Sequence, residues 1–177
     1  NNKKCAVLVE LALMNEKKYS GKLPPQESTL LLLLNNKKGK NARFTKQVNN
    51  DEQAELNNYI SFNVQNMKRK LKVQVKDREV SVSINLDVKI SVEEYPKGDV
   101  PEDIDRLNKL LSKELTEDAK QVITKLQQAN CDAFGIGRRL IAFHPKTWEV
   151  LDKKDYFKNI KFNTVVEAEI IKHGIVM

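Results

Sequence analysis

Apolar and polar residues alternate without interruption between residues 80 and 92. Every even position in this run is apolar and every odd position is polar. Seven apolar positions at a period of two predict a β-strand with one face on a hydrophobic core and the other in water. At about 3.3 Å per residue, such a strand runs roughly 40 Å. The apolar positions are Val80, Val82, Ile84, Leu86, Val88, Ile90 and Val92.

Two earlier segments, 59–66 and 68–75, show the same alternation. We predict that the second pairs antiparallel with the long strand through the polar turn at residues 76–79, because a short turn joins antiparallel strands. A sheet that is wet on one face is antiparallel or mixed. The pattern therefore excludes a doubly wound parallel sheet.

Apolar residues recur at steps of three and four between residues 104 and 126. This spacing predicts one amphipathic helix that opens at Pro101 and ends near Ala129. Some 27 residues give a helix of about 40 Å, which matches the long strand. We expect this helix to lie across the apolar face of the sheet.

The first fifty residues predict two short strands and one helix. Residues 5–14 are mostly apolar and predict a strand, and residues 15–21 predict a polar turn. Five consecutive leucines end a segment that starts with proline and an acidic residue, which predicts a helix over residues 25–35. We expect this helix to be buried on most sides, since five leucines cover more than one helix face. Residues 42–48 predict a further strand.

The last fifty residues predict a turn at 130–137, short helices at 138–143 and 146–151, and an alternating strand at 160–171. Strands followed by helices and a closing strand predict the α+β class. The expected architecture is an antiparallel or mixed sheet with long strands. One face is covered by the long amphipathic helix and by shorter helices.

Positive charge is concentrated in the first half of the chain. Residues 1–76 hold 15 basic and 6 acidic residues, a net charge of +9, whereas residues 77–177 hold 16 and 18, a net charge of −2. A basic half suggests an anionic partner such as phospholipid headgroups, nucleic acid or an acidic protein. A solvated surface is the simpler alternative, because the lysines occur in scattered pairs.

Cysteine usage and hydropathy exclude several classes of protein. Cys5 and Cys131 are too few for a disulfide framework and leave a single bridge or two free thiols as alternatives. No apolar run is long enough to span a membrane. The chain has no signal peptide and does not begin with Met, and we interpret it as an excised piece of a longer protein.

The sequence offers little catalytic chemistry. Gly135-Ile136-Gly137 could begin a phosphate-binding loop, but it follows a helix rather than a strand and lacks the third glycine. Glycines that permit a positive φ and a close backbone approach are the better interpretation. Arg138 and Arg139 could hold an anion, pair with Asp132 or be solvated. A hydrolase or phosphate-handling enzyme would rest on this segment alone.

The remaining chemistry-bearing residues have structural interpretations. His144 precedes a proline and suggests a turn, and neither it nor His173 has a serine or cysteine motif to act on. We expect Trp148 to lie in the core. The acidic residues of the segments 93–94 and 102–105 suit a strand end and a helix start. We therefore expect no catalytic, cofactor-binding or metal-binding residues, and too few aromatic residues accompany the basic half for nucleic-acid binding.

One ordered set of residues resembles a known family. A long helix that ends near Asp132 is followed by a Gly-x-Gly-Arg segment, a proline with a tryptophan three residues later, an aromatic pair, an alternating strand and a final glycine. This order resembles the C-terminal domain of the spore germination lipoproteins, the C subunits of germinant receptors (GerAC type). The residues are Phe134-Gly135-Ile136-Gly137-Arg138, Pro145, Trp148, Tyr156-Phe157, residues 160–171, Lys172 and Gly174, with Gly21, Leu23, Glu27 and Thr29 upstream.

The resemblance covers nearly the whole chain, with two departures, a missing second tryptophan and an anchoring cysteine that is not in this piece. Members of the family often carry a second tryptophan shortly before the closing aromatic pair, where this chain has Lys153-Lys154-Asp155-Tyr156. The resemblance implies a single domain, residues 1–177, from a longer lipoprotein whose anchoring cysteine lies upstream. It also implies a non-enzymatic subunit on the outer face of the spore inner membrane that works with two integral membrane subunits of the A and B type. The alternative function is a peripheral binding domain for anionic membranes or another acidic partner.

Overall fold

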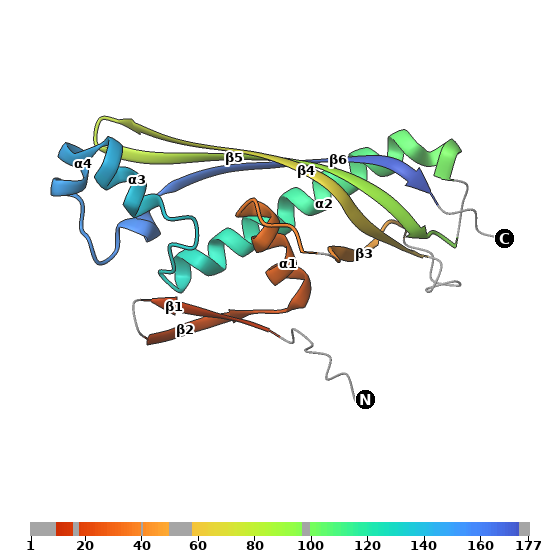
Figure 1. Ribbon diagram of the computed structural model, residues 1–177, viewed down its shortest axis with the longest axis horizontal. Coiled ribbons are helices and arrows are strands. Elements are labelled where there is room, and N and C mark those ends of the chain that lie inside the picture. The colour runs from red at the N-terminus through yellow and green to blue at the C-terminus, as the bar shows by residue number, and fades with distance from the viewer. Residues whose placement is uncertain (1–9, 16–17, 40, 50–57, 97–99, 174–177) are drawn as a thin grey trace.

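The computed structural model describes residues 10–15, 18–39, 41–49, 58–96 and 100–173. A four-stranded mixed sheet has the order β3-β4-β5-β6, and a separate two-stranded hairpin, β1-β2, lies at the opposite side of the helices (Figure 1). The fold is α+β, as predicted. Its elements are β1 (Leu11–Asn15), β2 (Lys18–Leu23), α1 (Pro25–Leu34), β3 (Arg43–Gln47), β4 (Tyr59–Lys76), β5 (Glu79–Glu94), α2 (Val100–Gln128), α3 (Ile136–Phe143), α4 (Pro145–Val150), the 3₁₀ helix η2 (Tyr156–Asn159) and β6 (Lys161–His173).

The two longest strands form the predicted hairpin. β4 pairs antiparallel with β5 from Ser61↔Glu94 to Lys76↔Glu79. Asp77 and Arg78 connect them with φ values of 50° and 67°. Positive φ at both positions suits a two-residue hairpin turn, because that twist matches the twist of the strands.

An irregularity in β4 joins the two segments that the sequence showed separately. The register with β5 shifts between Val64 and Asn66. Before the shift, even residues of β4 share a face with the buried even residues of β5, and after it odd residues do. An extra residue in one strand changes which side chains face the core. One strand of 18 residues therefore replaces the two predicted segments.

The long helix α2 covers the sheet as expected (Figure 1). All seven even positions from Val80 to Val92 are buried, and α2 packs most extensively against β6. β6 pairs parallel with β5, which makes the sheet mixed. The buried stripe of α2 consists of Leu107, Leu111, Leu115, Ala119, Val122, Ile123 and Leu126.

A polar stripe of α2 lies one residue further on and bonds the outer edge of β6. Three side chains on successive turns accept hydrogen bonds from three alternate backbone N–H groups of the strand. The Thr116 hydroxyl also donates to the Val166 carbonyl at 3.2 Å. An edge strand whose backbone is covered in this way cannot pair with another chain. The N–H bonds are Val166 to Thr116 Oγ1, Ala168 to Ser112 Oγ and Ile170 to Asn108 Oδ1, each 2.9 Å long.

The N-terminal segment contains one wrong prediction. Residues 15–21 were expected to be a polar turn, but Lys18–Leu23 forms the strand β2, antiparallel to β1. Its sequence, KYSGKL, has no apolar alternation, so pairing with β1 rather than local pattern makes it a strand. The predicted strand at 5–14 overlaps β1, although residues 5–9 lie outside the described part of the chain. The predicted strand at 42–48 is confirmed by β3.

Helix α1 matches its prediction closely, at Pro25–Leu34 against residues 25–35. Four of its five leucines are buried, and Leu32 is half-buried. Ser28, also buried, donates its hydroxyl hydrogen to carbonyl oxygens of the preceding segment, at 3.0 Å from Leu23 and 2.9 Å from Pro24. The helix is thus buried on most sides, as five leucines required.

Both predicted C-terminal helices are present with shifted starts. Helix α3 begins at Ile136 rather than 138, because the Asp132 carboxylate accepts hydrogen bonds from the N–H groups of Ile136 and Gly137. Helix α4 begins at Pro145, one residue before the predicted start. The predicted closing strand, 160–171, is confirmed by β6.

Replacing Thr116 by valine tests the bonding of the β6 edge. The change keeps the side-chain shape but leaves the N–H and carbonyl of Val166 without their partner. We expect Thr116→Val to lower the free energy of unfolding by about 1–3 kcal/mol in urea denaturation. Thr124→Val is the matched control, because its exposed hydroxyl bonds only the Lys120 carbonyl of the same helix. Equal losses in the two variants would contradict the assignment.

Candidate functional site

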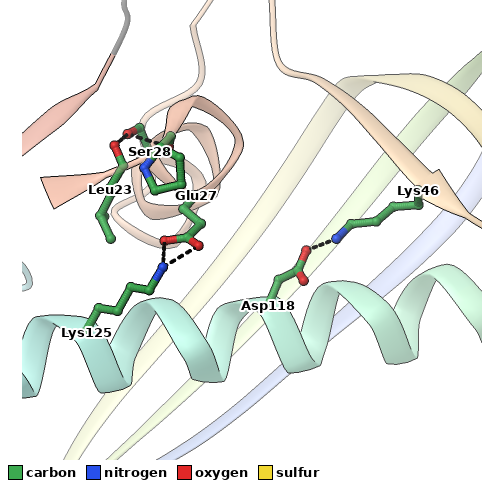
Figure 2. Close-up of polar contacts among 7 residues, drawn as sticks. Leu23, Glu27, Ser28, Lys46, Asp118 and Lys125 are labelled. Atoms are coloured by element: carbon green, nitrogen blue, oxygen red, sulfur yellow. Dashed lines mark hydrogen bonds and ion pairs between the residues drawn. The ribbon is translucent and has the colours of Figure 1, made fainter.

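A cleft of about 420 Å³ lies between the start of α1, strand β3 and the middle of α2. This volume falls in the range of small-molecule sites. Figure 2 shows that its charged side chains come from three elements that are far apart in the sequence. The cleft is lined by Pro24, Pro25, Gln26, Glu27, Leu30, Lys46, Asp118 and Gln121.

One side of the cleft is closed by an ion pair between helices. Lys125 Nζ contacts Glu27 Oε1 at 2.6 Å and Glu27 Oε2 at 2.7 Å. Glu27 lies in the first turn of α1 and Lys125 in the last turn of α2, where each charge is favoured by the dipole of its own helix. The pair therefore fastens α1 to α2 with both charges in favourable positions.

The other side is closed by an ion pair between Lys46 of β3 and Asp118 of α2 (Figure 2). The Lys46 side chain is only 15% exposed and that of Asp118 is 27% exposed. Partial burial strengthens the attraction relative to an exposed surface pair, whose worth is about 0–1 kcal/mol. Together the two ion pairs hold α1 and β3 against the same helix.

The cleft has hydrogen-bonding groups but no arrangement for catalysis. Its carboxylates are already paired with lysines, and none of the described residues that line it is a serine, cysteine or histidine. Across the described residues, no group of three or more His, Cys, Asp or Glu side chains is placed to hold a metal ion. The described residues that line the cleft can offer hydrogen bonds and apolar contacts to a small polar molecule or to a side chain of a partner.

The glycine segment that the sequence singled out is a turn built around Asp132. Its carboxylate accepts the Ile136 N–H at 2.9 Å, the Gly137 N–H at 2.8 Å and the Tyr156 hydroxyl at 2.7 Å. Gly135 has φ of 67°, a conformation that side chains disfavour. A Cβ on Gly137 would stand 2.5 Å from Tyr156 Oη. Both glycines are therefore explained by positive φ and close approach, as predicted.

The other sequence candidates also have structural surroundings. Arg138 and Arg139 are exposed, which fits solvation rather than a pair with Asp132. Trp148 is half-buried against the core, and its ring centroid lies 5.1 Å from that of Tyr156 in an edge-to-face contact. His144 precedes α4, and its carbonyl accepts the Trp148 N–H at 3.0 Å, so it is a turn residue.

The acidic candidates are paired rather than free for chemistry. Arg43 Nε lies 3.1 Å from Glu93 Oε2, and Arg43 Nη2 lies 3.4 Å from Glu94 Oε1. These contacts fasten β3 to the end of β5.

Asp103 belongs to a second cluster at the start of α2. It accepts hydrogen bonds from Arg106 and from the Tyr95 hydroxyl, and these bonds hold the pKa of Asp103 below its usual range. Asp105 is exposed and Glu102 lies in the first turn, where its charge favours the helix. These acids stabilise the start of α2, as the sequence indicated.

Cys131 is half-buried and has no disulfide partner among the described residues. Burial raises its pKa above the ordinary value for a thiol, so it is a poor nucleophile at neutral pH. Cys5 and the side chain of His173 lie outside what the structure describes. A bridge between the two cysteines stays untested.

Sequence reasoning missed the cleft itself. Glu27 was identified only as an acid that suits a helix start, and Lys46 and Asp118 carried no signal because 72 residues separate them. The proximity of the three elements results from tertiary packing, which no local pattern of residues indicates. The sequence does show an acidic residue in the first turn of one helix, Glu27, and a basic residue in the last turn of another, Lys125. It does not show that the two residues pair.

A protein-family model matches almost the whole chain. The model described as "Spore germination B3/ GerAC like, C-terminal" matches residues 10–174. The chain belongs to this family. The GerAC-type resemblance of the sequence is thereby confirmed, and the matched range includes the cleft and the Asp132 turn.

Two relatives agree with the family. The spore germination protein GerQC of Bacillus cereus is 22% identical over 122 residues, which are 67% of this chain and 34% of that protein. The crystal structure of the GerBC protein matches with a TM-score of 0.69 and 20% identity, over 89% of this chain and 49% of that one. The GerAC-type chain thus shares the GerBC fold and spans about a third of the length of its curated relative.

None of the described helices of this GerAC-type domain is both long and apolar enough to cross a bilayer. The longest, α2, has 29 residues, but charged residues occupy much of its surface.

Gly137→Ala tests whether the glycine segment is structural. The added methyl group meets Tyr156 Oη at 2.5 Å and Cζ at 3.0 Å, so we expect the free energy of unfolding to fall by about 1–3 kcal/mol. Gly39→Ala is the matched control, because its Cβ meets only the Asn41 carbonyl oxygen at 3.8 Å. Thermal and urea denaturation of both variants provide the comparison. A Gly137→Ala protein as stable as the control would contradict the close approach.

The raised pKa of Tyr156 predicts that the domain loses stability at alkaline pH. Burial, and then the hydrogen bond to Asp132, raise the pKa of Tyr156 above its ordinary value. Above a pH of about 10, the unfolded chain releases this proton while the folded chain keeps it, so the free energy of unfolding falls as pH rises. We expect urea denaturation between about pH 9 and 11 to show a smaller fall for Tyr156→Phe than for the unmodified protein. Tyr19→Phe, at a tyrosine that is 65% exposed, should leave the fall unchanged.

Proposed function

We propose that this chain is the C-terminal domain of a non-enzymatic lipoprotein subunit of a nutrient germinant receptor, and that it contributes to receptor assembly or signal relay. The observation that carries the proposal is the family match over residues 10–174, almost the whole chain. The GerBC-like fold supports it independently at the level of architecture.

The surroundings of the candidate residues support a binding role over a catalytic one. Gly135, Gly137 and Asp132 are occupied in building a turn, and the cleft carboxylates are occupied in ion pairs. A nucleophile with a base in hydrogen-bond reach is the usual mark of a covalent catalyst. The described cleft instead has paired charges at its two sides, which suits recognition.

The resemblance also supports a proposal about partners and location. We infer two integral membrane subunits, of the A and B type, as partners on the outer face of the spore inner membrane. Because the chain covers 34% of GerQC and 49% of GerBC, those proteins contain further segments that this chain does not match. We propose that residues 1–177 form one domain and that a lipid anchor upstream of it attaches the whole subunit to the membrane.

The alternative function, contact between the basic first half and anionic phospholipids, stays a prediction. Several cations of that half are paired, such as Lys22 with Glu10 and Arg43 with Glu93. Sedimentation with anionic and neutral vesicles at low and high salt tests it, since binding to an anionic surface weakens with salt. Salt-sensitive binding to anionic vesicles alone would favour this alternative.

Fractionation of dormant spores with an antibody to this domain tests the receptor proposal. We expect the full-length protein in the inner membrane, and we expect detergent extraction to recover it with two polytopic proteins. Gly137→Ala provides a destabilised reference, in which any loss of association would reflect the lowered stability of the domain. Recovery of the unmodified protein in the soluble fraction, or without polytopic partners, would overturn the proposal.

A further inference from the structure

The two edges of the main sheet differ in how far their backbone groups are hydrogen-bonded. Hydrogen bonds from α2 occupy the edge of β6, as described above. On the other side, β3 pairs with β4 only between Tyr59 and Asn63. From residue 66 to residue 76, no strand in the described part of the chain pairs with the outer edge of β4. This free edge runs about 35 Å, with N–H and C=O groups of alternate residues directed away from β5.

The two faces beside this free edge differ in chemistry. Lysines occupy positions 68, 70, 72 and 76 on the outer face, and all four are exposed. Leu71, Val73 and Val75 occupy the core face and are only half-buried, although the β5 residues opposite them are buried. One more strand beside β4 would complete the burial of this apolar row.

Arg69 interrupts the apolar row with an unsatisfied group. Its Nε atom is buried, and among the described residues it has no hydrogen-bond partner. Arg139 of α3 is near enough to add a like charge, and burial followed by this charge lowers the pKa of Arg69. Arg69 as a whole is half-buried, but a buried N–H group without a hydrogen bond is costly. A carboxylate that arrived at this point would satisfy the guanidinium and face both arginines.

We propose that the free edge of β4, residues 66–76, binds an extended acidic segment of a partner protein, which adds a fifth strand to the sheet. Backbone hydrogen bonds supply the pairing, and the side chains on the two faces supply the selection. The segment places acidic side chains beside Lys68, Lys70 and Lys72. On its other face it places apolar side chains beside the apolar row, with one carboxylate beside Arg69.

The charges disfavour pairing between the β4 edges of two copies of this chain. Pairing β4 with another β4 would set one row of lysines beside another, and like charges on neighbouring strands destabilise a sheet. Lysines on an edge strand are a common protection against such self-association. They repel a copy of the chain and attract an acidic strand.

The same face argues against a flat membrane as the occupant. Asp87 of β5 and Glu167 and Glu169 of β6 lie on the outer face beside the lysines, and all three are exposed. A flat anionic surface would meet these carboxylates together with the lysines. A strand paired with β4 would lie next to the lysine row. The carboxylate of Asp87 would be one strand beyond that row, and those of Glu167 and Glu169 two strands beyond it.

This inference goes beyond the proposed receptor function and does not depend on it. It rests on the geometry of one edge, so an acidic strand could bind there whether or not the protein fractionates with membrane partners. The spore fractionation and the experiment below can therefore fail separately.

A synthetic ten-residue peptide of alternating Glu and Val, labelled with a fluorophore, serves as the probe. We expect it to bind the unmodified 177-residue chain in a polarisation titration, and to slow hydrogen exchange of backbone N–H groups in residues 66–76. Two further peptides carry N-methyl groups on all Glu or on all Val nitrogens. At least one of them should bind about tenfold more weakly, because methylation removes the donors on one edge of a strand.

Charge reversal on the protein provides the second arm. Lys70→Glu combined with Lys72→Glu should weaken peptide binding by about tenfold or more, because it sets like charges beside the peptide. Lys109→Glu combined with Lys113→Glu makes the same change in net charge on the exposed face of α2 and should leave the affinity within about twofold. Matched melting temperatures confirm that all variants are folded.

Three outcomes would overturn the proposal. Equal binding of the parent and both methylated peptides would show attraction by charge without strand pairing. Equal weakening in the β4 and α2 variants would show that net charge alone matters. Binding of phosphatidylglycerol vesicles that requires Lys70 and Lys72, without peptide binding, would assign the lysine row to a lipid surface instead.

Discussion

Contact between α2 and the sheet is the interaction on which the other parts of the fold depend. Burying each large apolar side chain of its stripe contributes about 1.5–3 kcal/mol relative to exposure, and six such residues, together with Ala119, face the core. A helix turns about 100° per residue, so the polar stripe that begins at Asn108 lies beside the apolar stripe that begins at Leu107. One helix therefore covers the face of the sheet and bonds its β6 edge at the same time.

Helix α1 and strand β3 are attached to that same helix by ion pairs as well as by packing. Lys125 holds α1 through Glu27, and Asp118 holds β3 through Lys46. These two attachments frame the cleft, so its shape follows the separation of α1 and β3 along α2. A ligand that bound there would contact α1, β3 and α2 together.

The sequence predicted regular elements well wherever one face is buried. The long strand, the long helix and the leucine helix each have a hydrophobic period that fixes both the element and its buried side. β2 was missed because it has no such period, and a partner strand rather than its own sequence determines its conformation. The shift in β4 was visible as a change of apolar residues from even to odd positions, but it was interpreted as two segments.

The candidate site was less accessible to the sequence than the fold. Gly135 and Gly137 were interpreted correctly because glycine itself indicates a positive φ or a close approach at its position, although the residue that approaches Gly137, Tyr156, could not be read from the sequence. The cleft and the free edge of β4 are properties of pairs of elements. No local pattern reports that β3 ends after five residues and leaves most of the outer edge of β4 without a paired strand in the described part of the chain.

The parallel pairing of β5 with β6 has a consequence for how the protein is made. The hairpin β4-β5 is local and can close as soon as both strands leave the ribosome, but β6 is the last described element to be synthesised. Until it emerges, Asn108, Ser112 and Thr116 have no strand to bond, and α2 covers an unfinished sheet. The sheet can therefore be completed only after β6 has been synthesised, and the apolar surface that β6 covers stays exposed until then.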